Sequence, residues 1–307
     1  MDSVRALVIG YGSIGRRHAR VLTELGCRVG VVSRRAIDFP VVFASLAAGL
    51  AHWQPDYVVV ANRTNEHFDT LAELAGAGFV GKVLVEKPLF ADSRPLPAGT
   101  PQHLAVAYNL RFHPLLKRLK EILESEQGVL CAHVYTGHYL PAWRPGTDYR
   151  DSYSSHRSEG GGVLRDISHE LDYCLWLFGP WLRLAALGGR FGGLEIDSDD
   201  CFTILMATER CPSLCIHLNY LDRVARREII VNTVEHTVRV DLDQGLFALD
   251  DRIEAAQVEW DYTYLAEHQA VLDGQWSALC SVDDGLAVLA AIEAVEEANR
   301  KGKWVER

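Results

Sequence analysis

The sequence has no long hydrophobic run. None of the apolar stretches in its 307 residues approaches the roughly 20 residues that a membrane-spanning helix needs. The first residues lead directly into a strand-like apolar segment and show no signal-peptide pattern. We therefore expect a cytoplasmic protein without a membrane partner.

Cysteine is sparse and scattered. The seven cysteines are odd in number, only Cys211 and Cys215 lie close together, and no C-x-x-C pair occurs. Reduced core thiols are therefore a better expectation than disulfides. His217 lies near the close pair, but no fourth ligand follows at a recognisable spacing, so we expect no metal site.

Positive charge is in deficit, with 31 lysines and arginines against 41 aspartates and glutamates and a net charge of -10. Phosphate backbones are bound by basic surfaces, so this balance argues against a nucleic-acid partner. Hydrophobic residues make up 48% and charged residues 23% of the chain, as in ordinary globular proteins. The length predicts two domains.

The strongest local pattern lies near the N-terminus, where Gly10, Gly12 and Gly15 form the motif G-x-G-x-x-G. It follows an apolar run at 4–9, typical of a buried parallel strand, and precedes helical apolar spacing at 14–25. Gly10 permits a tight turn, Gly12 lets a pyrophosphate approach the backbone, and Gly15 lets the helix pack on the strand, with the free helix amides facing the anion. Glycine-rich turns also occur for purely structural reasons, but this context predicts dinucleotide binding.

The cofactor preference is indicated at the end of the next predicted strand, at 28–32. Ser33, Arg34 and Arg35 follow it, and no acidic residue occurs before Asp38. NAD-selective sites of this kind place an acid here to bind the ribose 2'-hydroxyl, whereas arginine suits a 2'-phosphate. We therefore expect NADP(H) to be favoured over NAD(H). The alternative is a solvated arginine pair on a loop.

A candidate chemical group follows another predicted strand, at 82–85. Glu86, Lys87 and Pro88 come directly after it, and the carboxyl end of a parallel strand is where doubly wound sheets bind ligands. A lysine there can polarise a hydroxyl or carbonyl oxygen as hydride moves. Taken alone, such a tripeptide is usually a surface turn, but its place after a buried strand favours a site.

Three glycines at 160–162 precede a segment whose spacing predicts one helix over 163–178. Its apolar residues fill one stripe, which should face the core. Aromatic residues beside acids on a second stripe favour a lined pocket over a solvated helix face, which is the alternative. The second stripe holds Arg165, Asp166, His169, Asp172, Tyr173 and Trp176.

A long segment at 139–159 is rich in Pro, Arg, Tyr and Ser and contains Trp143, Tyr149 and Tyr153. Loops of this length are usually functional or disordered, and the aromatic residues argue against disorder. Aromatic faces together with Arg144 suit a polyhydroxylated ligand, so we expect a loop that covers the substrate. An oligomer contact is the alternative.

Strand-like runs separated by short turns follow in the last third of the chain and predict an antiparallel sheet. They lie at 182–187, 201–207, 213–220, 228–232, 236–242 and 245–249.

Taken together, the segments resemble the glucose-fructose oxidoreductase, inositol dehydrogenase and rhizopine-catabolism (Gfo/Idh/MocA) family of NAD(P)-dependent oxidoreductases. The resemblance implies an α/β protein, with an N-terminal Rossmann domain, a doubly wound parallel sheet, at 1–112. It further implies a C-terminal α+β domain with an open, mostly antiparallel sheet at 113–307, and a homodimer or homotetramer through the exposed face of that sheet. The matching segments run over nearly the whole chain: 10–18, 61–67, 83–88, 108–114, 160–179 and 283–303.

The resemblance also implies catalytic roles. Lys87 matches a lysine between nicotinamide and substrate, and a cis peptide between Lys87 and Pro88 is implied. His169 matches the usual general acid/base. The family's carboxylate lies four residues before this histidine, where the present chain has Arg165. Asp166, three residues before, shares the helix face and is expected to do the same work.

The expected cofactor-binding residues lie in the glycine motif and in the loops that follow the predicted strands. They are Gly10, Gly12, Ser13, Ile14, Gly15, Ser33, Arg34, Arg35, Asn62, Thr64, His67, Glu86 and Lys87. The expected substrate-binding residues are Asn109, Arg111, Arg144, Tyr149 and Asp172. For Arg111 a structural ion pair is an equal alternative.

These expectations describe an NAD(P)-dependent dehydrogenase or reductase acting on CH-OH groups. It would transfer hydride between nicotinamide and a secondary alcohol or ketone of a sugar, cyclitol or sugar derivative. One alternative is an enzyme of the same scaffold that uses tightly bound cofactor transiently, as in an epimerase or an eliminating glycosidase. Another is a non-catalytic regulatory protein that binds a dinucleotide.

Overall fold

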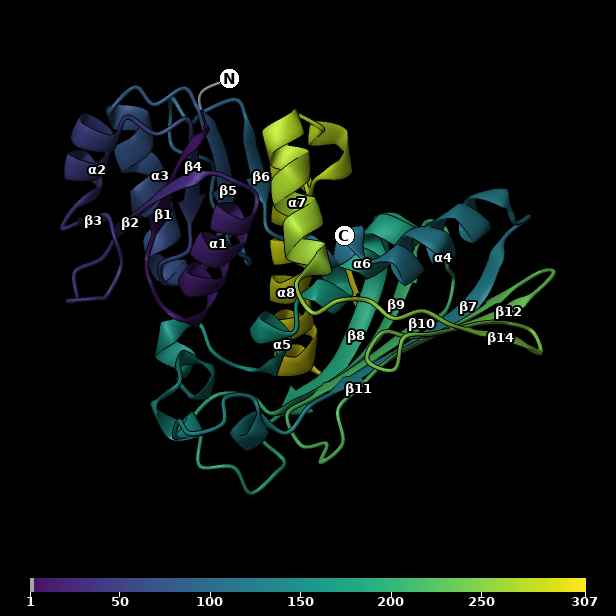
Figure 1. Ribbon diagram of the computed structural model, residues 1–307. Coiled ribbons are helices and arrows are strands. Elements are labelled where there is room, and N and C mark those ends of the chain that lie inside the picture. Colours follow the sequence, from purple (N-terminus) through teal and green to yellow (C-terminus); the bar gives the residue numbers. More distant parts are fainter. Residues whose placement is uncertain (1–2) are drawn as a thin grey trace. The chain divides into compact units, whose positions relative to one another are not determined.

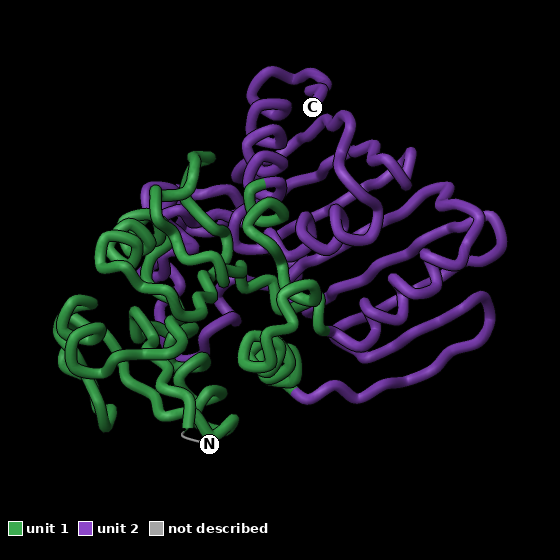
Figure 2. The backbone as a smooth tube through the Cα atoms, turned by 90° about the horizontal axis from the view of Figure 1, so that it is seen from above, with its two compact units in different colours: residues 1–112, 260–286 green, residues 113–259, 287–307 purple. Residues whose placement is uncertain are grey.

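The computed structural model describes residues 3–307 and divides into two compact units. The first contains the chain up to Phe112 together with Trp260–Leu286, and the second contains His113–Glu259 and Ala287–Arg307 (Figure 2). The expected second domain spanned all of 113–307, so the structure differs by including 260–286 in the first unit.

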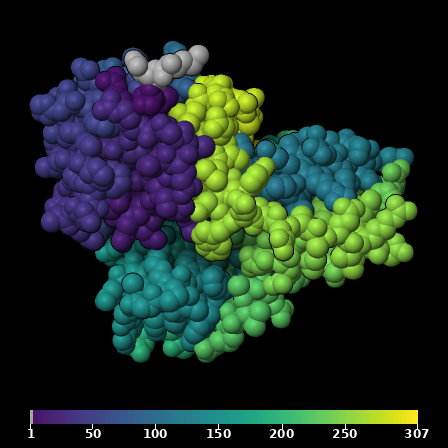
Figure 3. Space-filling view, in the orientation of Figure 1, coloured from purple at the N-terminus to yellow at the C-terminus, as the bar shows by residue number. Residues whose placement is uncertain are grey.

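Helix α7 (Tyr262–Asp273) accounts for this difference. Its Ala270 and Val271 belong to the apolar core of the first unit. The Lys82 ammonium donates a hydrogen bond to the carbonyl of Leu272 at 2.7 Å. Figures 1 and 3 show α7 beside α1 (Ser13–Glu24), which it contacts. Nothing in the sequence indicates which core this helix joins.

The first unit is built on a six-stranded sheet with the order β3-β2-β1-β4-β5-β6, in which every neighbouring pair is parallel. All four residues of its strand at Tyr57–Val60 are fully buried, as in parallel sheets that helices cover on both faces. The predicted Rossmann sheet is thereby confirmed. The strands are β1 (Arg5–Ile9), β2 (Arg28–Val32), β3 (Val42–Phe43), β4 (Tyr57–Val60), β5 (Lys82–Val85) and β6 (Leu104–Val106), and the remaining helices are α2 (Leu46–Trp53) and α3 (His67–Gly76).

The strand order reverses between β1 and β4, and doubly wound sheets bind ligands beside such a reversal. Backbone hydrogen bonds hold the chain segments that leave the strands there. Gly10 N–H donates to Val32 at 3.0 Å, Ala61 N–H to Ile9 at 2.8 Å, and Glu86 N–H to the Val60 carbonyl at 2.8 Å. The glycine turn and the loops after β4 and β5 therefore begin at one edge of the sheet.

The second unit is built on a nine-stranded sheet with the order β14-β13-β12-β11-β7-β10-β9-β8-β15. Only β10 and β7 run parallel among these neighbours, which confirms the open, mostly antiparallel sheet. All six strand-like runs form strands, β8 to β13, and β7, β14 and β15 complete the sheet. The bounds are β7 (Val129–Gly137), β8 (Trp181–Gly189), β9 (Cys201–Thr208), β10 (Leu214–Asn219), β11 (Arg226–Thr233), β12 (Thr237–Asp241), β13 (Leu246–Leu249), β14 (Arg252–Ala255) and β15 (Val305–Glu306).

The helix expected over 163–178 is interrupted. It forms α5 (Val163–Asp166) and α6 (His169–Phe178), because the backbone leaves the helical region at Ile167, with φ -97° and ψ 33°. On the second stripe, Asp172 and Tyr173 are fully buried, whereas His169 and Trp176 on the same helix α6 are partly buried.

Helix α6 is fixed to the sheet by a buried carboxylate. Glu170 is fully buried. Its Oε1 accepts a 2.8 Å hydrogen bond from the Thr136 hydroxyl on β7 and forms a 2.8 Å ion pair with Arg227 on β11. Thr136 and Arg227 are register partners, so one carboxylate joins the helix to two paired strands. This anchor sets the position of the neighbouring His169. Figure 1 shows α6 and α4 (Pro114–Ser125) on the same face of the sheet.

Two further observations concern the environment of the chain. Within residues 3–307, no helix combines the length and the apolar character needed to cross a membrane. All seven cysteines are free thiols, and Cys27, Cys174, Cys211 and Cys280 are buried. Helix α8 (Val282–Lys301) carries the chain from the first unit into the second.

Candidate active site

The glycine turn between β1 and α1 contains two glycines that the fold requires and one that it does not. Gly10 has φ +94°, and a Cβ on it would lie 2.6 Å from the Ala61 carbonyl oxygen. A Cβ on Gly15 would lie 2.1 Å from the Gly10 carbonyl oxygen. A Cβ on Gly12, by contrast, would meet nothing within 4 Å. Packing explains Gly10 and Gly15, whereas Gly12 leaves open space that an approaching ligand can use.

The open space lies at the start of a helix. Gly12 is the N-cap of α1, and no side chain among residues 3–307 caps this helix. The amides of Ser13 and Ile14 belong to its first turn, where backbone donors have no partner within the helix. Uncapped amides and a helix dipole favour an anion there, so the turn fits the pyrophosphate of a dinucleotide.

The two arginines that follow β2 differ in their contacts. The Arg34 guanidinium forms a 2.7 Å ion pair with Glu66, although its side chain is 79% exposed. The Ser33 hydroxyl accepts the Arg35 N–H at 3.1 Å and donates to the Arg35 carbonyl at 3.0 Å. In the described part of the chain the Arg35 guanidinium has no ion-pair partner, so it is the more accessible of the two for a ligand phosphate.

The segment after β4 holds one buried acceptor. The Asn62 amide donates to the Thr70 hydroxyl at 2.8 Å and to Glu66 at 3.2 Å. Its Oδ1 is buried and has no hydrogen-bond partner among the described residues. Thr64 begins a short 3₁₀ turn, Thr64–Glu66, that leads into α3. An orphaned amide oxygen beside the glycine turn fits a ligand that donates a hydrogen bond.

His67 has a structural environment. It is fully buried, and its Nδ1 lies 3.1 Å from the Leu89 carbonyl oxygen and 3.2 Å from that of Pro88. Burial is the main cause that lowers the pKa of His67, which keeps the imidazole neutral. The ring therefore ties α3 to the segment after Lys87, and its nitrogens already face carbonyl groups of this chain.

Lys87 stands at the carboxyl end of β5, next to the end of β4 in the sheet. The peptide between Lys87 and Pro88 is cis, as expected. Glu86 is buried, and its Oε2 accepts the Lys87 N–H at 3.1 Å while its Oε1 lies 2.8 Å from His18. Both carboxylate oxygens of Glu86 are thus engaged by the chain itself.

Asn109 and Arg111 lie in a buried 3₁₀ turn, Asn109–Phe112. The Asn109 amide donates to the Thr263 hydroxyl at 2.6 Å. Arg111 is 5% exposed and forms a 2.9 Å ion pair with Asp284. The structural ion pair that was the alternative for Arg111 is therefore present.

In the second unit, His169 is the first residue of α6 and is partly buried. The Asp166 carboxylate accepts a 2.6 Å hydrogen bond from Tyr220, and burial, with this carboxylate second, raises the pKa of Tyr220 well above its usual value. Arg165, at the position of the family's carboxylate, forms a 3.0 Å ion pair with Glu296. Asp166 and Arg165 thus have separate structural partners.

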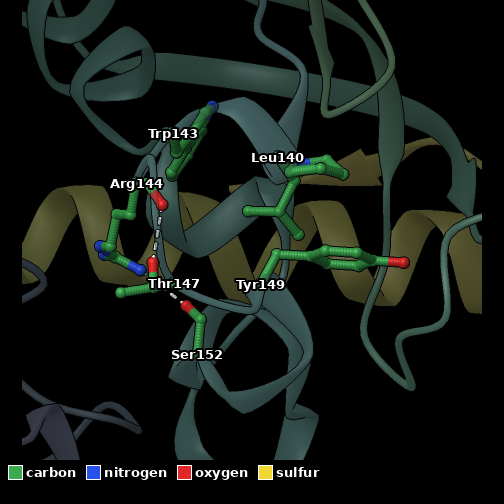
Figure 4. A pocket seen from close by; sticks show the side chains of 7 residues that line it. Leu140, Trp143, Arg144, Thr147, Tyr149 and Ser152 are labelled. Carbon is green, nitrogen blue, oxygen red and sulfur yellow. Dashed lines mark hydrogen bonds between the residues drawn. The ribbon is translucent and has the colours of Figure 1, made fainter.

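The segment 139–159 is built from short 3₁₀ turns around a pocket in the second unit. Figure 4 shows Arg144 and Tyr149 both at the pocket, which Leu140, Pro141, Trp143, Thr147 and Ser152 also line. Arg144 donates to the Ser152 hydroxyl at 2.7 Å, and the Tyr149 hydroxyl accepts the Glu195 N–H at 3.1 Å. Asp172, by contrast, is fully buried in α6 and does not line this pocket.

Sequence reasoning missed three buried polar residues of the first unit. His18, Tyr57 and His268 are all fully buried, and they form a hydrogen-bonded chain that ends on Glu86. The available signal was their position: His18 and His268 interrupt the buried faces of α1 and α7. A polar residue on a buried helix face needs a partner, which the sequence alone does not name.

One group of described side chains has the composition of a metal site. The ligand atoms of Glu126, Glu235 and His236 lie within 4.8 Å of one another. His236 also pairs with Asp250 at 2.8 Å, and this hydrogen bond raises the pKa of His236. Acidic side chains gather at protein surfaces without an ion as well, and Glu235 is exposed.

Comparison with known proteins gives two family matches and a consistent set of solved structures. Residues 4–100 match the model of an oxidoreductase family with an NAD-binding Rossmann fold, and residues 118–248 match the Gfo/Idh/MocA C-terminal domain. No curated protein sequence matches the chain.

The similar structures agree in fold over nearly the whole chain. GenD2 from gentamicin A biosynthesis, in complex with NAD, is 24% identical, with 100% of this chain and 97% of that chain covered and a TM-score of 0.82. Levoglucosan dehydrogenase with NADH and levoglucosan is 14% identical, with 99% of each covered and a TM-score of 0.84. The WlbA dehydrogenase from Bordetella pertussis, with NADH and UDP-GlcNAcA, is 18% identical, with 99% and 98% covered and a TM-score of 0.79.

At these identities the solved structures establish the fold, while the two family models together cover more than half of the chain. The chain belongs to the Gfo/Idh/MocA family of oxidoreductases, with an NAD-binding Rossmann domain.

Proposed function

We propose that the chain is an NAD(P)-dependent dehydrogenase or reductase that acts on a secondary alcohol or ketone of a sugar, cyclitol or sugar derivative. The observation that carries the proposal is the open space at Gly12, at the uncapped start of α1. The bound nicotinamide would supply or accept the hydride. Sugar-derived ligands in the similar structures support the substrate class, since levoglucosan and UDP-GlcNAcA are bound there.

The proposed catalytic groups are Lys87, His169 and Asp166. A lysine ammonium stabilises negative charge on the substrate oxygen as hydride moves. A neutral imidazole at His169 takes the hydroxyl proton in oxidation and returns it in reduction. Asp166 is proposed to assist His169 from three residues earlier. For the substrate we propose Arg144 and Tyr149, which share one pocket.

Replacing the catalytic groups tests this assignment. A screen of sugars, cyclitols, sugar acids and nucleotide sugars, followed by nicotinamide absorbance, first identifies the substrate that turns over. On it, Lys87→Ala and His169→Ala should each lower kcat by about 10² to 10⁴ while cofactor binding is retained. The matched controls are Lys303→Ala and His52→Ala, at exposed sites. Unchanged turnover in both catalytic variants would refute the assignment, whereas cofactor that copurifies and is never consumed would favour an epimerase or eliminating glycosidase.

Substituting two glycines separates cofactor binding from folding. Gly12→Ala places a Cβ in open space, so the protein should fold normally but bind dinucleotide at least about tenfold more weakly. Gly15→Ala drives a Cβ against a backbone carbonyl and should cost about 1 to 3 kcal/mol of stability. Thermal unfolding and the quenching of protein fluorescence by NADH and NADPH measure both effects. Full cofactor affinity in Gly12→Ala would contradict the proposed site.

We also propose that NADP(H) is favoured over NAD(H), although the similar structures hold NAD or NADH. The support is Arg35, whose guanidinium lacks an ion-pair partner in the described chain, whereas Arg34 is paired with Glu66. A charge-assisted hydrogen bond contributes about 1.5 to 3 kcal/mol, so Arg35→Ala should weaken NADPH binding by about ten- to a hundredfold. NADH binding should not change, and Arg34→Ala is the control. Equal affinity of the parent protein for the two cofactors would overturn the preference.

Finally, we propose a homodimer or homotetramer through the accessible face of the nine-stranded sheet. Leu205 is 49% exposed on β9, and its register partners Ala185 and Cys215 are also partly accessible. Leu205→Glu should therefore dissociate the oligomer, as measured by light scattering during size exclusion. Val80→Glu is the control, since Val80 is 86% exposed in the first unit. A monomeric parent protein, or an unchanged mass in Leu205→Glu, would exclude this interface.

A further inference from the structure

Four polar side chains form a continuous hydrogen-bonded chain inside the first unit. The Tyr57 hydroxyl lies 2.8 Å from His268 Nδ1, His268 Nε2 lies 2.8 Å from His18 Nδ1, and His18 Nε2 lies 2.8 Å from Glu86 Oε1. Tyr57, His268 and His18 are fully buried, and Glu86 is 8% exposed. They come from β4, α7, α1 and the end of β5, so segments far apart in the sequence contribute.

Burial determines the direction in which the hydrogens point. Burial above all, followed by the charge of Glu267, raises the pKa of Tyr57 well above its usual value, so Tyr57 retains its proton. Burial is also the main cause that lowers the pKa of His268, which therefore carries one ring proton. If Tyr57 donates to His268 Nδ1, then His268 donates through Nε2 to His18, and His18 donates through Nε2 to Glu86. Each group in this arrangement has its partner.

The opposite direction leaves one hydrogen without an acceptor. If His18 were an imidazolium, it would donate from both nitrogens, and His268 would have to donate from Nδ1 to the Tyr57 oxygen. The Tyr57 hydroxyl would then need another acceptor, and it has none among the described residues. An unsatisfied buried donor costs about 1 to 3 kcal/mol. The hydrogen bonds are therefore all donated in one direction, from Tyr57 towards Glu86.

The hydrogen-bonded chain ends on Glu86, whose carboxylate accepts the N–H of Lys87. Burial alone would raise the pKa of Glu86, but the hydrogen bond from His18, followed by the charge and the N–H of Lys87, brings it below its usual value. His67 on α3 and Tyr264 on α7 also face this charge. Glu86 is therefore ionised. Because charges interact mutually, its carboxylate stabilises the Lys87 ammonium as much as the ammonium stabilises it.

We propose that Glu86 is the positioning residue for Lys87, and that Tyr57, His268 and His18 hold its carboxylate in place. The carboxylate fixes the backbone of Lys87 through the 3.1 Å hydrogen bond and keeps a negative charge beside its side chain. The inference rests on the function proposed for Lys87. It adds a role for three residues far apart in the sequence that contact neither substrate nor cofactor in that function.

Histidine NMR tests the direction of the chain without any substrate. In the full-length protein with ¹⁵N-labelled histidine, His18 and His268 should both be neutral and protonated at Nε2 near neutral pH. Signals are assigned with the His18→Asn and His268→Gln variants. Tyr57→Phe removes the first donor and should shift the His268 signals. An imidazolium at His18, or a proton at Nδ1 of either ring, would overturn the proposed direction.

Chemical labelling tests the effect on Lys87, again without turnover. Acetic anhydride acetylates uncharged amines, and mass spectrometry gives the rate at each lysine. Glu86→Gln removes the charge that stabilises the ammonium, so Lys87 should be acetylated about threefold faster or more. Lys303 is exposed in the same protein and serves as the internal control. If Glu86→Gln fails to fold, Tyr57→Phe, which leaves the carboxylate in place, should give a smaller change in the same direction.

A purely structural role predicts a different result. It would lower the melting temperature of Glu86→Gln and Tyr57→Phe without changing Lys87 acetylation in the folded protein, and this outcome would refute the inference. On a substrate found by the screen, Glu86→Gln should lower kcat. If Lys87→Ala abolishes turnover but Glu86→Gln alters neither kcat nor labelling, the proposed function stands and the inference fails. If labelling responds but Lys87→Ala keeps full activity, Glu86 positions Lys87 but the proposed catalytic role of Lys87 fails.

Discussion

The close approach of two backbone segments at the glycine turn is the constraint on which the candidate site depends. Only a residue without a Cβ fits at Gly10 against Ala61, or at Gly15 against Gly10 itself. This approach brings the start of α1 to the sheet edge where β1 and β4 diverge. Parallel strands end at the same edge of the sheet. The strand order therefore places the helix amides, the orphaned Asn62 oxygen and the backbone of Lys87 at that edge. The geometry favours an anionic, extended ligand.

Buried charge sets the second constraint. Both units contain a carboxylate deep in the structure, and each is retained because it has specific partners: Glu86 with His18 and the Lys87 N–H, and Glu170 with Thr136 and Arg227. Burying a carboxylate without partners costs much free energy, so the folded protein requires these partners to be in place. Each carboxylate also lies next in sequence to a proposed catalytic residue, Lys87 or His169. The groups that would do chemistry are therefore next in sequence to buried carboxylates that have specific partners.

Much of this arrangement could be predicted from the sequence, and the reasons are physical. Periodicity and glycine spacing report on neighbours along the chain, so the parallel strands, the glycine turn and the six strands after 181 were all predictable. The cis peptide at Lys87 and Pro88 followed from the family resemblance. Contacts between distant segments were not predictable: the joining of 260–286 to the first unit depends on which core receives Ala270 and Val271. The interruption at Ile167 and the chain from Tyr57 to Glu86 likewise depend on tertiary partners.

The central claim is that this protein transfers hydride from a carbon of its substrate. The most direct measurement uses the polyol or sugar with the largest nicotinamide absorbance change, deuterated at the carbon that carries the reacting hydroxyl. After incubation with the oxidised cofactor, the nicotinamide is recovered and analysed by NMR and mass spectrometry. One deuterium is expected at C4 of the nicotinamide, on one face of the ring. Cofactor that contains no deuterium although the substrate has been converted would contradict it.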